Sequence, residues 1–206
     1  EKQEQLLPIE LEPKHRKVYD TYLARDRQQL LGLLEDFYGN RIQVLRALTR
    51  LRQLSLHPAL MDDEPAAVNP AQIEYLSEQL PILIDEGHSA LVFSSFTGFL
   101  KLIAARLDAD GIAYSYLDGS TAITRRGEQI EQFTHGRTRV FLISLKAGGF
   151  GLNLTAADYC FMTDPWWNPA AENQAVDRAH RIGQHRAVTV YRMVSTGTIE
   201  EKVIDL

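Results

Sequence analysis

VFLISLKAGGFGLNLTAADYCFMTDPWWNPAAENQAVDRAHRIGQ, from Val140 to Gln184, is the stretch around which this sequence is organised. It opens with the apolar run Val140–Ser144, which is typical of a buried β-strand. A cluster of glycines closed by an asparagine follows directly: Gly148, Gly149, Gly151 and Asn153. Glycine lets the backbone turn sharply, take positive φ and approach a ligand that a Cβ would hold away. A glycine turn after a strand is more often structural than ligand-binding, so its surroundings decide its meaning.

Three polar side chains near the end of this stretch are spaced for one face of a helix. They are Gln174, Arg178 and Arg181, and their offsets of four and seven residues fall on one helical stripe. Two permanently charged guanidinium groups on one stripe suit a polyanion, most simply the phosphates of a nucleotide. The alternative interpretation is an ordinary solvated helix face.

From Ser89 onward, apolar runs typical of strands alternate with segments of helical periodicity. The runs are SALVFSS, IAYSYLD, TRVFLIS, DYCFMTD and VTVYRMV, and the helical segments cover 96–109, 121–134 and 169–181. This alternation predicts a parallel sheet covered on both faces and joined by right-handed crossovers. Ligands bind such sheets beyond the carboxyl ends of the strands. Polar and glycine-rich segments follow four of the runs and therefore predict one binding surface: Ser94, Asp118–Thr121, Ser144–Asn153 and Asp164–Asn168.

The N-terminal part predicts an extended opening segment, Leu6–Pro13, followed by two helices. The first helix is expected from Lys14 to about Leu34, with an apolar face made by Val18, Tyr22, Leu30, Leu33 and Leu34. The second is expected from about Arg41 to Leu54, with a buried stripe made by Leu45, Leu48, Leu51 and Leu54. These helices either only pack on the main domain or have a role of their own. The acidic, proline-containing segment 61–70 is the predicted linker to the main domain, 71–206.

The composition is that of an ordinary globular protein, with 45% hydrophobic and 24% charged residues among 206. No apolar run has the length of a membrane span and no signal-peptide pattern is present, so no membrane partner is expected. Cys160 is the only cysteine, which excludes a disulfide framework and favours a reducing compartment. The net charge is −5, but the segments 41–57 and 178–192 each carry four arginines and no acid. A locally basic face of this kind is compatible with DNA binding.

Taken together, AGGFGLNLTAADYCFMTDPWWNP and DRAHRIGQ closely resemble the two last signature motifs of Swi/Snf-type ATPases, the DNA-translocating branch of the superfamily-two helicases. PKHRKVYDTYL and LRQLSLHPAL resemble the helices that open the second lobe of these enzymes and form a protrusion, here within 1–60. VYRMVSTGTIEEKVIDL resembles the closing strand and brace helix, 187–206. The resemblance implies an α/β fold: a parallel-sheet, RecA-like (P-loop NTPase-like) helicase C-terminal domain with an N-terminal helical protrusion, similar to bacterial and archaeal members.

The resemblance also implies a set of contacts to the DNA backbone. LVFSSFTGFLKLI resembles the first motif of the second lobe, and YLDGSTAITRRGEQIEQF resembles the motif that contacts DNA phosphates. The residues expected to contact DNA are Ser94, Thr97, Gly119, Thr121, Arg126, Ser144, Lys146 and Gly148. Helix capping by Ser120 or Thr121 is the alternative to phosphate contact, which we favour for Thr121. The chain departs from its relatives at Ser95, where they often have glutamine, and at Thr124 and Arg125, where they favour acids.

For the nucleotide, the resemblance implies that Gly149, Gly151 and Asn153 line the cleft between two lobes. The expected catalytic residues are Arg181, Arg178 and Gln174. Arg181 would reach the γ-phosphate of ATP bound on the first lobe and stabilise the charge that develops during phosphoryl transfer. No G-x-x-x-x-G-K-[ST] loop and no metal site are found in the sequence. ATP and Mg²⁺ are therefore expected to be bound mainly by the N-terminal ATPase lobe of the same protein.

The predicted function is that of the second motor lobe of a DNA-dependent ATPase that translocates on double-stranded DNA, as chromatin remodellers do. The sequence stops at Leu206 without a helix cap, which suggests a fragment, and alone it is expected to hydrolyse nothing. The expected partners are double-stranded DNA, the first lobe and a protein bound to DNA. The expected location is the cytoplasm, on the nucleoid, or the nucleus of a eukaryote. The alternatives are the lobe of a strand-separating helicase and a non-catalytic DNA- or protein-binding module.

Overall fold

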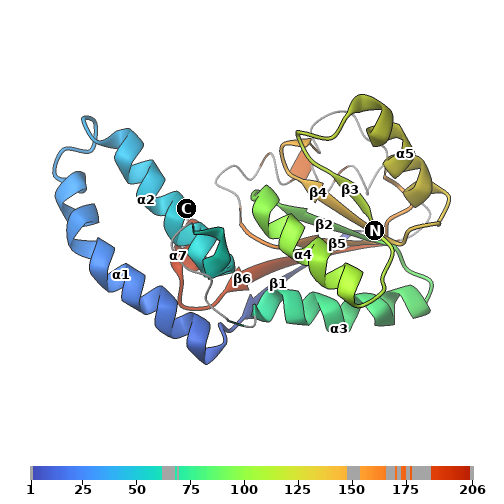
Figure 1. Cartoon of the computed structure of the whole chain (residues 1–206), viewed down its shortest axis with the longest axis horizontal. Helices are drawn as coiled ribbons and strands as arrows, with labels where there is room; N and C mark the ends of the chain where they lie inside the picture. The colour runs from blue at the N-terminus through green and yellow to red at the C-terminus, as the bar shows by residue number, and fades with distance from the viewer. Residues whose placement is uncertain are drawn as a thin grey trace.

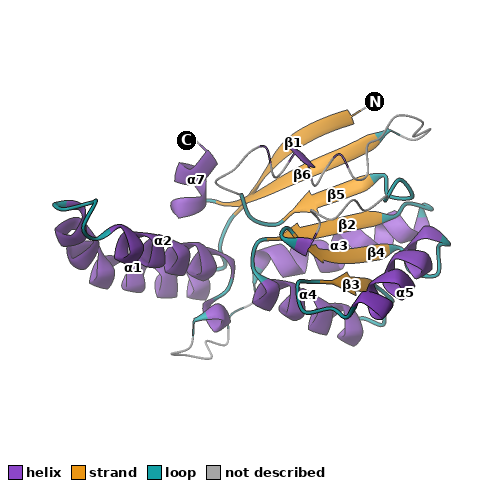
Figure 2. Cartoon of the chain, turned by 90° about the horizontal axis from the view of Figure 1, so that it is seen from above, coloured by secondary structure: helices purple, strands orange, loops and turns teal. Residues whose placement is uncertain are grey.

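A parallel sheet of six strands forms the centre of the part of the chain that the computed structural model describes: residues 2–61, 68, 70–147, 154–165, 170, 173, 174, 177 and 187–204. The strand order is β1-β6-β5-β2-β4-β3, and all pairings are parallel. The strands are β1 (Lys2–Ile9), β2 (Ala90–Ser94), β3 (Ser115–Leu117), β4 (Val140–Ser144), β5 (Tyr159–Met162) and β6 (Val188–Ser195). The predicted parallel α/β fold is confirmed (Figure 2).

Helices cover both faces of the sheet, which explains the continuous apolar runs of its central strands. Every residue of β2 and β4 is buried. On one face, α3 (Ala71–Asp85) and α4 (Thr97–Ala109) pack on Val92 and Leu142. On the other face, Phe133 of α5 (Ile123–Thr134) packs on the alternate side chains of the same strands. The polar segments after β2, β3, β4 and β5 are therefore brought to one edge of the sheet.

Two helices form a protrusion beside the sheet, α1 (Pro13–Leu34) and α2 (Arg41–Leu56), and both views show them side by side (Figures 1 and 2). The protrusion is anchored at its base. There Arg16 of α1 donates to the carbonyl oxygen of Gly197 at 2.9 Å, and Nε2 of His15, 2.6 Å from the carbonyl oxygen of Leu54, joins α1 to α2. Tyr19 and Leu54 are buried in a small cluster with Ile199, the first residue of α7 (Ile199–Ile204). The short 3₁₀ helix η1 (Pro58–Leu60) ends the protrusion.

The predicted buried stripe of the second helix is only half right. Leu51 and Leu54 are buried, but Leu45 is 53% exposed. Val44 is buried in its place, and Leu34 of the facing helix is 45% exposed. The reason is that the outer half of the protrusion is only two helices thick, so it cannot enclose a full apolar stripe on each helix.

The opening segment, predicted to be extended over Leu6–Pro13, is a strand that begins earlier, at Lys2, and ends at Ile9. β1 pairs with β6 along eight residues, from Lys2 opposite Val188 to Ile9 opposite Ser195. It lies at the edge of the sheet, where Pro8 can be accommodated even though it has no backbone donor. Among the described residues no helix is both long and apolar enough to cross a membrane.

Candidate functional site

A buried carboxylate organises the edge of the sheet where the polar segments meet. Asp164 follows β5, is 1% exposed, and accepts hydrogen bonds from Ser94, the last residue of the neighbouring strand β2, and from Ser95 after it. Oγ of Ser94 donates to Oδ1 at 2.6 Å, and the backbone amide of Ser95 lies 3.2 Å from each carboxylate oxygen. Oγ of Ser95 donates to Oδ2. The carboxylate thus fixes Ser94 and Ser95, between the end of β2 and the N-cap of α4.

The partner of this carboxylate comes from the protrusion. Nη2 of Arg52, on α2, lies 3.6 Å from Oδ2 of Asp164 and donates to the carbonyl oxygen of Pro165 at 2.9 Å. The exposed fractions of the two side chains are 7% and 0%. The guanidinium carbon also lies 5.2 Å from the ring centre of Phe96. The two opposite charges compensate each other, because either charge alone would have lost its hydration on burial without gaining a partner.

The sequence indicated the basic character of α2 but not the separate role of Arg52. The available signal is its position on the helix: it follows Leu51 and lies three residues before Ser55, both of which are buried. An arginine on the buried side of a helix requires a buried acceptor. The acceptor, Asp164, lies more than a hundred residues further along the chain, so no local pattern identifies it.

Of the four described residues expected to contact DNA near β2 and β4, two are exposed and two are enclosed. Thr97, in the first turn of α4, is exposed, and so is Lys146. Ser94 is fully buried, with its hydroxyl donating to Asp164 and accepting from the amide of Phe96. This geometry gives Ser94 an internal partner in place of the expected phosphate.

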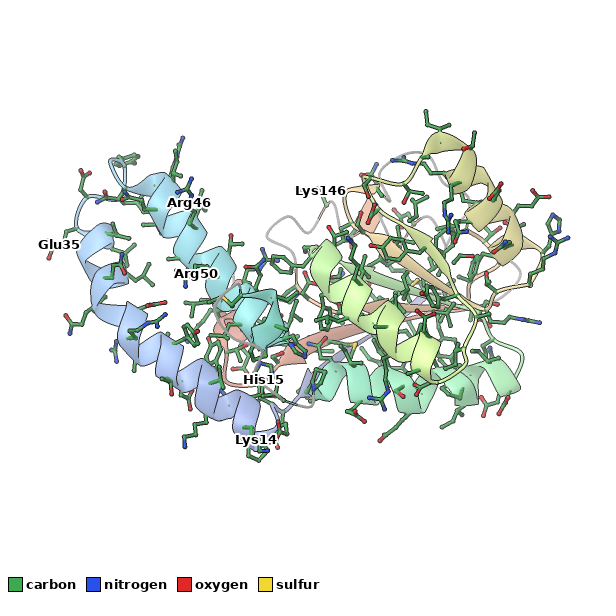
Figure 3. All side chains as sticks on the ribbon, in the orientation of Figure 1. Lys14, His15, Glu35, Arg46, Arg50 and Lys146 are labelled. Atoms are coloured by element: carbon green, nitrogen blue, oxygen red, sulfur yellow. The ribbon has the colours of Figure 1, made fainter. Side chains whose placement is uncertain are left out.

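Ser144 also has an internal role. It is 5% exposed, and its hydroxyl accepts a hydrogen bond from the amide of Ala147 at 3.1 Å. That bond closes the turn after β4 and leaves Lys146 directed outward. Figure 3 shows Lys146 at the upper edge of the sheet domain in that view, with Arg46 and Arg50 along α2 of the protrusion.

The segment after β3 is a turn built around Asp118. Oδ1 of Asp118 accepts from the amide and the hydroxyl of Ser120, and Oδ2 accepts from the hydroxyl of Tyr116 at 2.7 Å. Burial opposes ionisation, but the hydrogen bonds from Ser120 and Tyr116 lower the pKa of Asp118. Oγ1 of Thr121 accepts from the amide of Asp118 at 3.0 Å.

Helix capping by Ser120 or Thr121 is wrong as an explanation of this segment. The N-cap of α5 is Ala122, which makes no side-chain cap hydrogen bond. The hydroxyl groups of Ser120 and Thr121 instead make hydrogen bonds within the turn and hold its shape. Side-chain bonds of this Asx type are an alternative to helix formation for the backbone amides nearby. Arg126 supports the turn from the helix, with Nε donating to the carbonyl oxygen of Thr121 at 2.9 Å. Gly119 lies exposed at its tip.

A groove of about 740 Å³ adjoins this turn. Its lining combines cationic, acidic and aromatic side chains from α4, β3 and α5, among them Lys101, Asp108, Tyr114, Tyr116, Asp118 and Arg125. A smaller groove of about 320 Å³ lies between α1 and α2 and includes Arg46 and Arg50. Arg41, Arg46 and Arg50 are exposed, and the described part of the chain provides no ion-pair partner for them.

The remaining predicted site residues lie outside the described residues: Gly148, Gly149, Gly151, Asn153, Arg178 and Arg181. Gln174 is helical and exposed, and it lies at one end of the predicted stripe. The described residues contain no group of three or more His, Cys, Asp or Glu side chains that could hold a metal ion.

Sequence similarity to known proteins shows the family to which this chain belongs. Residues 71–183 match the family described as the helicase conserved C-terminal domain. The chain is also 40% identical over 165 residues to the putative ATP-dependent helicase/translocase YwqA of Bacillus subtilis, a match that covers 78% of this chain and 18% of YwqA. The chain belongs to the Swi/Snf family. Within this family of superfamily-two helicase-like ATPases it is the C-terminal RecA-like lobe.

Solved Swi/Snf structures agree with this assignment over the whole chain. The C-terminal domain of the Sulfolobus solfataricus SWI2/SNF2 ATPase has a TM-score of 0.78 and 26% identity, covering 100% of this chain and 84% of that domain. The core of the same ATPase in complex with double-stranded DNA has a TM-score of 0.81 and 28% identity, covering 100% of this chain and 43% of the core. The chain spans only 10–20% of the length of the curated relatives it matches.

Proposed function

We propose that this Swi/Snf lobe is the second motor lobe of an ATP-dependent translocase acting on double-stranded DNA. The observation that carries the proposal is the gathering of exposed donors at the carboxyl edge of a parallel sheet. Lys146, Thr97 and the Gly119 turn follow three different strands of that edge. Lysine, hydroxyl and backbone amide groups are the usual donors to DNA phosphates, and such contacts position a protein without reading sequence. The archaeal relative whose core was solved with double-stranded DNA supports the same ligand.

The enclosed serines then act indirectly. Ser94 and Ser95 hold Asp164, and Ser144 holds the turn that presents Lys146. We propose that Thr121 still contributes a phosphate contact, since it is only half-buried in a turn whose shape Asp118 already fixes. Preorganised donors of this kind bind phosphates without losing conformational entropy on binding.

The second part of the proposal concerns ATP. Gly149, Gly151 and Asn153 would face the cleft toward the nucleotide-binding lobe, and Arg181, helped by Arg178 and with Gln174 on the same stripe, would stabilise the transferring phosphate. An arginine finger of this kind accelerates hydrolysis by about 10³–10⁵-fold. The roles proposed for the side chains of this lobe involve no metal ligation, and magnesium would be held with ATP by the other lobe.

The experiment measures ATP turnover by the full-length protein, with and without double-stranded DNA. Arg181→Ala is expected to reduce turnover by about a thousandfold while DNA binding is retained. Lys146→Ala is expected to weaken DNA binding and to reduce the salt dependence of binding by about one released ion. Lys17→Ala is the matched control, because Lys17 is an exposed lysine on α1, away from the carboxyl edge.

Two outcomes would overturn the proposal. Full turnover by Arg181→Ala would remove the arginine finger and favour a non-catalytic binding module. ATP-dependent separation of a forked duplex would favour a strand-separating helicase, which shares the lobe architecture. DNA-stimulated turnover without strand separation, together with displacement of a third strand from a triplex, is the result expected of a translocase.

A further inference from the structure

The buried pair of Arg52 and Asp164 joins the protrusion directly to the carboxyl edge of the sheet. Arg52 lies near the base of α2, and Asp164 lies at the carboxyl edge of the sheet. A single guanidinium group contacts Oδ2 of Asp164 at 3.6 Å, the carbonyl oxygen of Pro165 at 2.9 Å and the ring of Phe96. The protrusion is thereby bound directly to the ends of β5 and β2.

The other contacts at the base of the protrusion reach different elements: Arg16 of α1 donates to the carbonyl oxygens of Thr196 and Gly197 after β6, and the hydroxyl of Tyr19 accepts from the amide of Ile199. Tyr19, Leu51 and Leu54 form an apolar cluster, and Oγ of Ser195 donates to the carbonyl oxygen of Ser55 at 3.0 Å. These contacts tie the base of the protrusion to β6, the turn after it and α7. A guanidinium group is a rigid planar donor, so its bonds to a carboxylate and a carbonyl do fix a direction. Arg52 adds a directional contact at the ends of β2 and β5, and substitution of Arg52 alone tests its effect on the angle of the protrusion.

The direction matters because both joined parts carry exposed cations. Arg46 and Arg50 lie one and two helical turns from the tip of α2, on the helix that carries Arg52. Lys146 lies at the edge of the sheet to which Arg52 is bound. A rigid duplex can contact both sets of cations only if the protrusion keeps one orientation relative to that edge.

We infer that Arg52 is a positioning residue: by binding Asp164 and Pro165 it sets the angle of the protrusion, so that the α2 arginines and Lys146 act on the same DNA duplex. This inference rests on the proposed function of the lobe. It gives the protrusion a role in aligning DNA contacts, and it gives Asp164 the role of an internal anchor. Arg52 itself is enclosed and makes no contact with DNA.

The angle of the protrusion can be measured directly in the full-length protein. Spin labels are placed at Tyr38→Cys, at the tip of the protrusion, where the residue is 91% exposed, and at Glu128→Cys, on the exposed side of α5. Cys160 is buried, and burial raises the pKa of its thiol to about 12, so it does not compete for the label. The distribution of distances between the labels reports the orientation of the protrusion.

Three variants of the pair are compared with a control in these measurements. Arg52→Met removes the charge and keeps much of the volume, and Arg52→Lys keeps the charge but loses the planar fork. Arg52→Met alone leaves the buried carboxylate of Asp164 without a partner, which can destabilise the fold. The double variant Arg52→Met with Asp164→Asn removes both charges and therefore avoids this destabilisation. Arg27→Met is the matched control, because Arg27 is an exposed arginine of α1 outside the site.

We expect all three variants to broaden the distance distribution, with Arg52→Lys intermediate and Arg27→Met unchanged. DNA-stimulated turnover should fall by about tenfold in Arg52→Met, while Arg27→Met stays within about twofold of the original. The single variant Asp164→Asn keeps Arg52. Its distance distribution should be narrower than that of the double variant but broader than that of the original protein, because Pro165 remains an acceptor for Arg52.

An unchanged distance distribution in the folded double variant would overturn the inference and leave the pair with a purely stabilising role. A broadened distribution with unchanged DNA stimulation would overturn the link between the angle and DNA. Failure of the proposed function is a different result: the unmodified protein would show no stimulation by DNA, while the label distances would still report whether Arg52 fixes the protrusion.

Discussion

Oε1 of Glu200 accepts a hydrogen bond from the backbone amide of Ser195 at 2.8 Å, in a position where the Glu200 side chain has no contact with solvent. This bond closes the turn between β6 and α7. The hydroxyl of Thr198 supports the same turn by donating to the carbonyl oxygen of Ser195 at 2.8 Å. A carboxyl group in such a place makes the stability of the lobe depend on pH.

Burial raises the pKa of Glu200 to about 8, against the opposing effect of the Ser195 amide, and the charge of Asp164 acts in the same direction as burial. An acid whose pKa is higher in the folded chain binds more protons there than in the unfolded chain. The free energy of unfolding should therefore fall as pH rises from about 4.5 to about 8. Glu200→Gln should flatten this dependence, whereas the exposed neighbour Glu201→Gln should not.

Above pH 6.5 the effect of Glu200 on stability can be separated from that of the two buried histidines. Burial lowers the pKa of His57 to about 4 and lowers that of His15, so both histidines make stability rise with pH up to their ordinary value of 6.5. Above that value only Glu200 remains of the three, and stability should fall by about 1–2 kcal/mol up to pH 8. Urea denaturation at several pH values measures this, and a flat profile in the original protein would contradict it.

Tyr19 is predicted to secure the brace helix to the protrusion. Its hydroxyl accepts a hydrogen bond from the amide of Ile199, the first residue of α7, at 2.9 Å. Tyr19→Phe leaves that amide without its partner and should lower the free energy of unfolding by about 1–3 kcal/mol. Tyr22→Phe is the control, because Arg25 stacks on the ring of Tyr22 and the ring is kept. Equal losses in chemical denaturation would mean that the Tyr19 bond is weak.

The two halves of α2 should respond differently to truncation. Leu54 is 1% exposed, so Leu54→Ala should cost about 2–5 kcal/mol through lost apolar contact and a cavity. Leu45 is 53% exposed, so Leu45→Ala should change stability by about 0.5 kcal/mol or less. Thermal and urea unfolding of the two variants compare a base leucine with a tip leucine of the same helix. A large loss for Leu45→Ala would indicate that the tip is enclosed by another part of the protein.

Removing the carboxylate of Asp118 should cost more stability than removing that of Asp108, which forms an exposed hydrogen bond to Tyr114. Asp118→Ala leaves the Ser120 amide and the Tyr116 hydroxyl without an acceptor, which should cost about 2 kcal/mol and weaken DNA binding through the misshapen Gly119 tip. Asp108→Ala removes only an exposed hydrogen bond to Tyr114 and should cost little. Denaturation and DNA titration test both effects, and normal DNA binding by Asp118→Ala would separate the turn from the DNA surface.

The stability that Asp118 supplies should also depend on pH. Its pKa is lowered in the folded protein, so its contribution is fully present above the ordinary value of 3.8 and is lost as pH falls through the folded value. The acid limb of the unfolding profile should therefore be shallower in Asp118→Ala than in the original protein. An identical acid limb would show that the carboxylate is not stabilised by its turn.

Local patterns in the sequence determined the parallel fold and predicted the edge of the sheet at which the candidate site lies. The apolar runs of β2 and β4 require cover on both faces, and polar segments that follow parallel strands necessarily meet at one edge. The motif resemblance identified the family. The resemblance also predicted DNA contacts by Lys146 and Thr97, and both lie within three residues of the end of a strand.

Only the tertiary structure decided which distant groups pair. The sequence places Arg52 in a basic helix and Ser94 among phosphate donors, but the fold brings both to the carboxylate of Asp164. The polar opening strand finds its partner in β6, at the other end of the chain. Helical and strand periodicity indicate which face of an element is buried, but not what covers it. Pairing between distant residues depends on which faces meet and on the loss of water there, so it appears only when the chain is assembled.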